Sequence, residues 1–186
     1  MAKMLPPEIS QKQLEKSAAE GIIFKLFSEC PGTDDWIVLH SLLLAEHNFK
    51  QSGEVDFVVL CPRGIFFLEV KGGGISREGG RWYTTGKEGR YELKESPFDQ
   101  INDAMHSAIN RIYKEEFASD HNVCNLLFGK GVMFPQTEKT EELSFGTEAD
   151  IKTIFFKDNR HQPISKYIAA LAKFTEQQTP TKKRPT

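Results

Sequence analysis

The chain has 186 residues, of which 39% are hydrophobic and 27% charged, and its formal net charge is −2 at pH 7. These values are typical of one soluble globular domain, and no stretch approaches the roughly 20 apolar residues that a membrane span needs. The slightly negative charge excludes a protein that binds nucleic acid by bulk positive charge alone, although a bound divalent cation can reverse the sign locally.

Cysteine and histidine usage points to no metal or disulfide framework. Cys30, Cys61 and Cys124 are widely spaced and odd in number, with no Cys-x-x-Cys pair, so we interpret them as reduced core thiols. The five histidines show no ligand spacing, and His40 and His47 are interpreted as structural or exposed. Because residues 1–10 also lack the apolar run of a signal peptide, the expected location is cytoplasmic, without membrane association.

The first third of the chain predicts a helix followed by a strand. Ser10 and Gln13 have capping-box spacing, and apolar residues then recur every fourth position, which predicts an amphipathic helix over 11–27. After a turn rich in Pro, Gly and Asp, the apolar, β-rich run 36–44 predicts a strand, and 47–53 is expected to be a polar connection.

Two further strands form the feature on which the functional interpretation depends. Residues 54–60 and 65–71 are apolar runs separated by Cys61-Pro62-Arg63-Gly64, whose Pro and Gly positions suit a type I turn. We therefore predict a tight antiparallel hairpin. Three consecutive glycines follow at 72–74 and are expected to form a hinge or turn.

The remaining chain completes an α/β pattern. Residues 81–84 and 90–93 are candidate short strands, and Ser96-Pro97 is expected to begin a second helix with an apolar face. The late elements are predicted as strands over 125–134 and 150–156 and a helix over 163–178. We expect one domain over residues 1–178, a central mixed β-sheet flanked by α-helices, and a disordered polar tail over 179–186.

The predicted hairpin brings three charged side chains together. If a four-residue loop pairs Leu60 with Ile65, counting back places Asp56 opposite Glu69, and Lys71 shares the face of Glu69 because residues two apart in a strand point the same way. A bulge would shift this register.

Two facing carboxylates repel each other, and a divalent cation between them removes the repulsion. Mg²⁺ and similar hard cations prefer one or two carboxylates together with waters and substrate phosphates. Lys71 lies where it can orient or polarise the attacking water, so the trio suits phosphodiester hydrolysis. The alternative is an ordinary ion pair on a solvated sheet face. The position of Glu69 at the end of an apolar, interior-type strand favours the functional interpretation.

Residues 77–95 offer a second candidate surface. Five basic residues alternate there with Trp82, Tyr83 and Tyr91, a combination that suits contact with nucleic acid. Four glutamates alternate with them, which favours a solvated hairpin instead. The glycines at 72–74 are not a phosphate-binding loop, because no Gly-Lys-Ser/Thr ending follows.

The chain resembles the nuclease-related domain (NERD) family of the PD-(D/E)xK group, which has restriction-endonuclease-like folds. The resemblance covers about residues 15–135 and is densest at Gly53–Leu60 and Gly64–Lys71. Its other segments are Ser17–Gly21, Trp36–Leu42 and Ser96–Gln100.

The resemblance implies metal ligation by Asp56 and Glu69, with Mg²⁺ or Mn²⁺ as the cofactor, and a catalytic role for Lys71. It also implies that Glu20, on the first helix, completes the site and that Gln100 lines it from the second helix. Ser96 departs from the family pattern, which usually has Asn there. Domains of this family often accompany helicase, kinase or zinc-binding modules, so a helicase or other DNA-processing partner, fused or separate, is expected.

Three functions follow from this sequence. The first is a metal-dependent nuclease acting on nucleic acid, DNA rather than RNA, in DNA processing or repair. The second is a non-catalytic nucleic-acid-binding or interaction module of the same fold, which the near-neutral charge favours. The third is a structural interaction domain that uses exposed Phe residues, of which the chain has 14 in total.

Overall fold

The computed structural model describes residues 1–44, 53–111, 126–139 and 150–179. Its core is a mixed six-stranded sheet in the order β1-β2-β3-β4-β8-β9. β2 and β4 each pair with β3 antiparallel, whereas β1–β2, β4–β8 and β8–β9 are parallel pairs. The strands are β1 (Lys3–Leu5), β2 (Ile37–Leu44), β3 (Gly53–Cys61), β4 (Gly64–Val70), β8 (Phe128–Phe134) and β9 (Ile154–Phe156).

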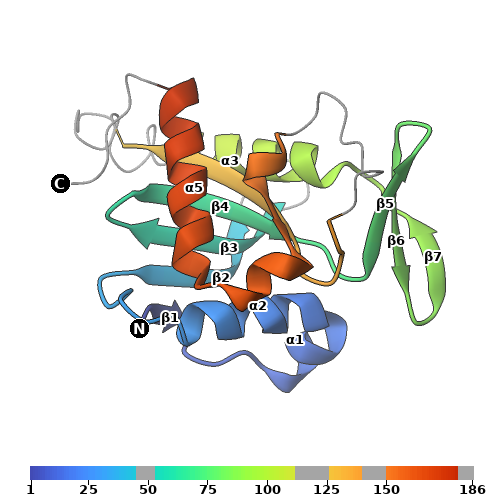
Figure 1. Ribbon diagram of the computed structural model, residues 1–186, viewed down its shortest axis with the longest axis horizontal. Coiled ribbons are helices and arrows are strands. Elements are labelled where there is room, and N and C mark those ends of the chain that lie inside the picture. The colour runs from blue at the N-terminus through green and yellow to red at the C-terminus, as the bar shows by residue number, and fades with distance from the viewer. Residues whose placement is uncertain (45–52, 112–125, 140–149, 180–186) are drawn as a thin grey trace.

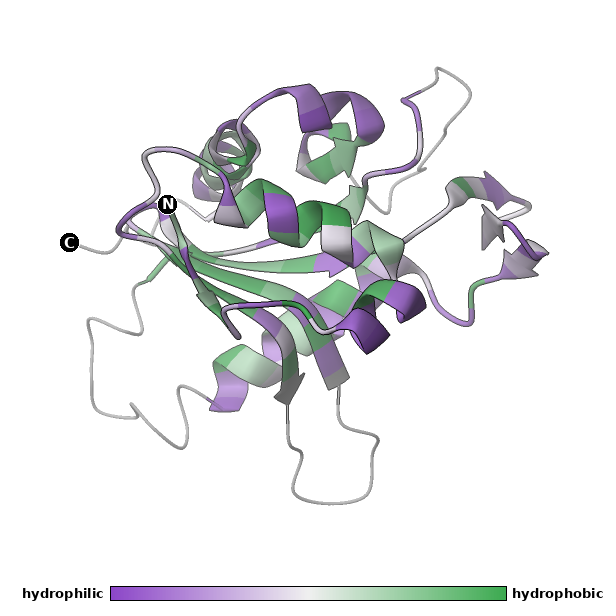
Figure 2. Cartoon of the chain, turned by 90° about the horizontal axis from the view of Figure 1, so that it is seen from below, coloured by the Kyte–Doolittle hydropathy of each residue, from purple (hydrophilic) through white to green (hydrophobic). Residues whose placement is uncertain are grey.

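Helices cover both faces of this sheet, as predicted (Figure 1). α2 (Ala18–Ser28) and α5 (Ile164–Gln178) pack on one face, where their buried side chains join a cluster with alternate residues of β3 and β4. α3 (Pro97–Arg111) packs on the other face. Apolar residues concentrate in the sheet and on the helix faces turned toward it (Figure 2). The molecule is thus a three-layer α/β structure.

A second sheet lies to one side of the core. It consists of β5 (Gly74–Glu78), β6 (Arg81–Gly86) and β7 (Gly89–Glu92), paired antiparallel in sequence order. The candidate strands at 81–84 and 90–93 are confirmed, but they belong to this separate sheet, which is mostly hydrophilic (Figure 2). Trp82 and Ile75 are its buried side chains and anchor it to the core beside α3.

The N-terminal helix departs from its prediction. The capping box of Ser10 and Gln13 is present, but the helix predicted over 11–27 is two helices, α1 (Gln11–Lys16) and α2, because Ser17 adopts an extended backbone. Its hydroxyl accepts a hydrogen bond from the N–H of Glu20, 3.3 Å away, and so caps α2. A serine at this position starts a new helix more readily than it continues one.

The two late strands are shorter than expected, whereas the helix predicted over 163–178 is confirmed as α5. The strand predicted over 150–156 is reduced to β9, preceded by a 3-10 helix at Ile151–Thr153 and followed by another at Lys157–His161. Asp150 caps the first of these through the N–H of Lys152, which bends the chain away from the sheet. The strand predicted over 125–134 begins at Phe128.

Several sequence predictions fall outside the described residues. These are the thiol of Cys124, His47, the connection over 47–52 and the tail beyond Thr179. Cys30 and Cys61 are free and buried, as expected. Within the described ranges, no helix combines the length and apolar character needed to cross a bilayer.

Candidate active site

The β3–β4 hairpin has the predicted register for most of its length. Leu60 pairs with Ile65, and the ladder continues to Phe57 and Leu68, the last paired residues of these two strands. At the next position the side chain of Asp56 replaces a backbone group: Oδ2 accepts a hydrogen bond from the N–H of Val70, 2.7 Å away. Asp56 therefore lies in line with Glu69, as predicted, but it reaches β4 through its carboxylate.

Strand β3 changes face at Asp56. Phe57 packs with the cluster under α2 and α5, whereas Val55, two residues earlier, packs with the cluster under α3. In a regular strand these two residues would share a face. The neighbouring strand changes face at the same level, since His40 contacts Phe57 and Leu42 packs on the α3 side.

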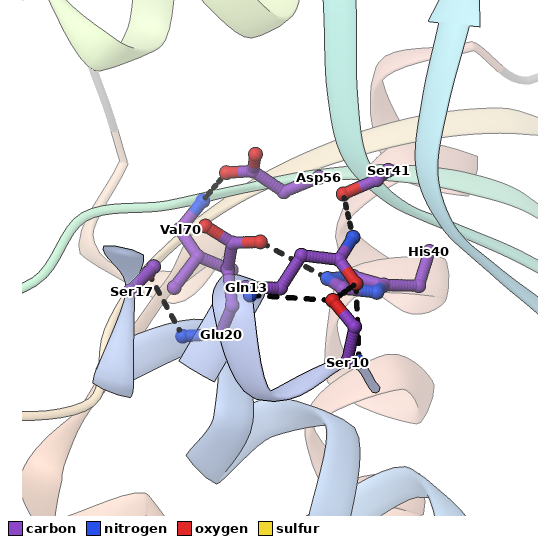
Figure 3. Close-up of polar contacts among 8 residues, drawn as sticks. All are labelled: Ser10, Gln13, Ser17, Glu20, His40, Ser41, Asp56 and Val70. Atoms are coloured by element: carbon purple, nitrogen blue, oxygen red, sulfur yellow. Dashed lines mark hydrogen bonds and ion pairs between the residues drawn. The ribbon is translucent and has the colours of Figure 1, made fainter. Parts of the chain in front are cut away.

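The irregularity in β2 is located at Ser41. Its φ of 54° is in the left-handed region, the only positive φ among the described non-glycine residues. Gln13 of α1 donates a hydrogen bond from Nε2 to the Ser41 hydroxyl at 3.3 Å (Figure 3). Backbone conformations of this kind cost of order 1–3 kcal/mol and concentrate at functional sites.

Glu69 and Lys71 share one face at the end of β4, as alternation predicts. The side chain of Glu69 is only 2% exposed, and its Oε1 accepts a hydrogen bond from Lys71 Nζ at 2.5 Å. The same ammonium donates to Gln100 Oε1 on α3, 2.9 Å away. Lys71 is held in place by its backbone N–H, which donates to Met133 O of β8 at 2.9 Å. β8 thus fixes the backbone of Lys71, and Gln100 on α3 helps to hold its ammonium beside the buried carboxylate of Glu69.

Burial and like charge shape the electrostatics of this pair. The pKa of Asp56 is raised well above its usual value, first by burial and then by the charge of Glu69. Burial also raises the pKa of Glu69, although the ammonium of Lys71 opposes the shift. Both groups would be more stable with additional positive charge nearby.

Glu20 reaches the site from the other side. It extends from α2 toward the strands that carry His40 and Asp56 (Figure 3), and its Oε2 lies 3.0 Å from Nε2 of His40. Burial disfavours its charged form, but hydrogen bonds from His40 and Ser17 outweigh that effect and lower its pKa. The negative charge of Glu20 adds to the raised pKa values of both Asp56 and Glu69.

One feature of the carboxylates favours binding of a divalent cation, and another shows that protein side chains alone do not complete its coordination. Oε2 of Glu69 is buried and accepts no hydrogen bond from any described residue, a costly state that a cation would relieve. Across the described ranges, however, no group of three or more His, Cys, Asp or Glu side chains is arranged to hold a metal ion. The donor set is therefore that of a site completed by water and substrate oxygens.

Sequence reasoning anticipated five site residues, and the structure brings them to one end of the sheet. Glu69, Lys71 and Gln100 are in direct contact. Asp56 and Glu20 interact with them electrostatically. The partner of Glu20 was missed, because His40 lies 20 residues away along the chain and only the packing of α2 on β2 brings the two together. Neither the His40 sequence context nor its spacing carried a signal of this contact.

The fold and the cluster define a restriction-endonuclease-like α/β domain, in which two adjacent strands carry acidic residues and a lysine. A model of the nuclease-related domain family, NERD, matches residues 15–129. The chain therefore belongs to the nuclease-related domain family, and through it to the PD-(D/E)xK group. No curated protein matches significantly. No solved structure does so either.

Proposed function

We propose that this protein is a metal-dependent nuclease that hydrolyses phosphodiester bonds of DNA, in DNA processing or repair. The observation that carries the proposal is the buried carboxylate of Glu69, with one oxygen bonded to Lys71 and the other without a donor among the described residues. A purely structural ion pair gains nothing from a second, unsatisfied oxygen beside the acidic Asp56.

Asp56 and Glu69 would hold the ion, Mg²⁺ or Mn²⁺. When bound, such an ion supplies Lewis acidity, which neutralises negative charge that develops on a phosphate. Asp56 keeps one carboxylate oxygen for this purpose, because only Oδ2 is bonded to Val70 N. We expect the apo site to bind metal weakly, since two carboxylates leave most positions to water and substrate.

Lys71 is the proposed catalytic cation. Its side chain is 23% exposed, and Glu69 and Gln100 fix the direction of its ammonium. In this position it can orient the attacking water or a phosphate oxygen, and its charge stabilises the transition state. Gln100 positions Lys71, and Glu20 adds a third carboxylate next to the pair.

The proposed substrate is DNA rather than RNA, delivered with help from a helicase or another DNA-processing partner. The need for a partner follows from the net charge of −2. It also follows from the second sheet, where Arg90 pairs with Glu78 and Arg81 pairs with Glu92. Two buried, free thiols support a reducing, cytoplasmic setting.

A non-catalytic binding or interaction module of the same fold is the competing function, and the near-neutral net charge of −2 favours it. A cleavage assay separates the two. Supercoiled plasmid and labelled single strands are incubated with Mg²⁺, with Mn²⁺ or with chelator. We expect products only with metal, and none from Asp56→Asn. Binding without cleavage under all metal conditions would favour the binding module.

A further inference from the structure

His40 is a buried histidine whose ring is held between two aromatic side chains and contacts Glu20. Its side chain is fully buried, and its ring is held by Phe57 at a centroid distance of 4.7 Å and by the edge of Phe24 at 5.6 Å. Two aromatic neighbours on β3 and α2 therefore fix the plane of the imidazole. Within this plane, Nε2 is directed at Oε2 of Glu20, 3.0 Å away.

The other ring nitrogen identifies the tautomer. Nδ1 is buried and has no hydrogen-bond partner among the described residues. A buried N–H without an acceptor is rarer and more costly than a lone pair without a donor. The proton therefore resides on Nε2, and His40 donates it to the Glu20 carboxylate.

This arrangement restrains a flexible side chain. Glu20 lies in the first turn of α2, where the Ser17 hydroxyl caps its backbone N–H and, after His40, also lowers the pKa of its carboxyl through a hydrogen bond. Its side chain is 14% exposed, so without His40 it could rotate toward solvent. The donor at Nε2 keeps one carboxylate oxygen engaged, and the negative charge of this carboxylate acts on Asp56 and Glu69 at the end of β3 and β4.

Resting on the proposed nuclease function, we propose that His40 is a positioning residue of the same site, which holds the Glu20 carboxylate beside Asp56 and Glu69 and so strengthens metal binding and turnover. The left-handed backbone of Ser41, the next residue, helps to place His40. It lets β2 change face, so His40 stays on the α2 side while Leu42 packs on the α3 side.

A structural alternative makes a different prediction. If His40 only fills the core between Phe24 and Phe57, an aromatic ring of similar size should replace it without effect on the site. If it acts through Glu20, loss of the Nε2 donor should matter as long as Glu20 is present. A double-mutant cycle between the two residues measures this dependence.

The experiment compares wild type, His40→Phe, Glu20→Ala and the double variant by Mn²⁺ calorimetry and by cleavage of plasmid and single strands. His40→Gln tests rescue, because its amide can donate to Glu20. Thr175→Val is the matched control, since it removes a buried hydroxyl bonded to Leu171 O on α5. Should His40→Phe fail to fold, the pair His40→Gln and His40→Asn replaces it, because both are amides and only Gln has the reach.

We expect His40→Phe to weaken Mn²⁺ binding about tenfold or more and to lower kcat with little change in KM, as loss of an outer partner of a metal site does. In the Glu20→Ala background the same change should have no further effect, and His40→Gln should recover most of the affinity. Unchanged affinity in His40→Phe, or an equal loss in both backgrounds, would overturn the inference. If wild type binds Mn²⁺ with this coupling but cleaves nothing, the nuclease proposal fails and the role of His40 stands.

Discussion

Asp56 combines a hydrogen bond that supports the fold with a charge that opposes it. Its Oδ2 replaces a ladder bond by accepting from Val70 N, while burial and the charge of Glu69 raise its pKa. A carboxyl with a raised pKa in the folded state contributes stability fully below its unfolded pKa, and this contribution is lost as pH rises through the folded pKa. Above that range, the ionised Asp56 destabilises the metal-free protein.

The substitution Asp56→Asn separates these two effects. Asn keeps an acceptor oxygen for Val70 N and removes the charge, so the metal-free variant should melt at a higher temperature than wild type at pH 8. The gain corresponds to about 1.4 kcal/mol for each unit by which the pKa of Asp56 is raised. It should disappear below about pH 4, where the wild-type carboxyl is protonated as well.

Thermal melts in chelator across this pH range provide the test, with Asp34→Asn as a control at an exposed carboxyl. The pKa of Asp34 is lowered by the N-terminal ammonium, so this variant should lose stability slightly rather than gain it. An Asp56→Asn protein less stable than wild type at pH 8 would contradict the electrostatic account.

Metal affinity should also depend on pH. Carboxylates must lose their protons to bind a cation, and the pKa values of Asp56 and Glu69 are both raised. The affinity for Mn²⁺ should therefore keep rising with pH above the ordinary carboxyl range, which lies near 4. Calorimetry between pH 5 and 8 measures this rise, and a constant affinity across that interval would show that the pair is already ionised at pH 5.

Individual site residues differ in how far the sequence predicts them. Strand alternation sufficed for Glu69 and Lys71, because β4 is regular up to its end. The register also brings Asp56 in line with Glu69, but alternation does not predict that β2 and β3 both change face at this level, where Ser41 of β2 has a left-handed backbone. No residue pattern in the sequence marks Ser41, whose conformation follows from its tertiary surroundings.

At the scale of elements, hydrogen bonds at the glycines after β4 join the second sheet to the strand end that carries Lys71. Gly73 N donates to Gln136 Oε1 at 2.8 Å, Thr137 Oγ1 donates to Gly73 O at 3.0 Å, and Thr84 Oγ1 donates to Gly72 O at 2.7 Å. Hydrogen bonds to Gln136, Thr137 and Thr84 therefore hold the segment 72–74 in a fixed position. It sets the position of β5–β7 relative to Lys71, two residues before Gly73.

Gly73→Ala tests the importance of this connection. Gly73 has a φ of 78°, and a Cβ there would lie 2.5 Å from Thr85 O. Because neither the backbone nor Thr85 O can easily yield, we expect a loss of about 1–3 kcal/mol in unfolding free energy and reduced cleavage.

Gly86→Ala is the matched control in the same sheet, because a Cβ at Gly86 meets no atom within 4 Å. It should change stability by no more than about 0.5 kcal/mol. Urea unfolding and cleavage rates of both variants decide the matter. Equal effects of the two substitutions would mean that the segment 72–74 does not set the position of β5–β7 relative to Lys71.

The first helix shows why element boundaries are harder to predict than their existence. Leu14, Ala18, Ile22 and Leu26 keep one helical spacing across the whole segment, yet Ser17 ends α1 and caps α2. The apolar spacing predicts a helical segment but not its buried face, because none of these four residues is buried and α2 instead buries Ala19, Ile23, Phe24 and Phe27. It is silent on a local hydrogen bond that competes with the helix at a single residue.

For the whole molecule, the sequence predicts the central sheet and its covering helices better than the division of the strands into two sheets. The order of helices and strands, with apolar faces of helical and strand period, sufficed for a mixed sheet covered on both sides. It did not predict that β5–β7 form a sheet of their own. That arrangement depends on Trp82 and Ile75 packing against α3, a contact between distant parts of the chain.

The comparison of Lys71→Ala with Glu69→Ala tests the central claim most directly, with cleavage rate, Mn²⁺ affinity and melting temperature measured on each. If Lys71 orients the reacting groups, Lys71→Ala should lose about a hundred- to a thousandfold in turnover and still bind Mn²⁺ above pH 7. Glu69→Ala should lose both binding and activity, because it removes a proposed ligand. Cleavage by Lys71→Ala at the wild-type rate would contradict the account.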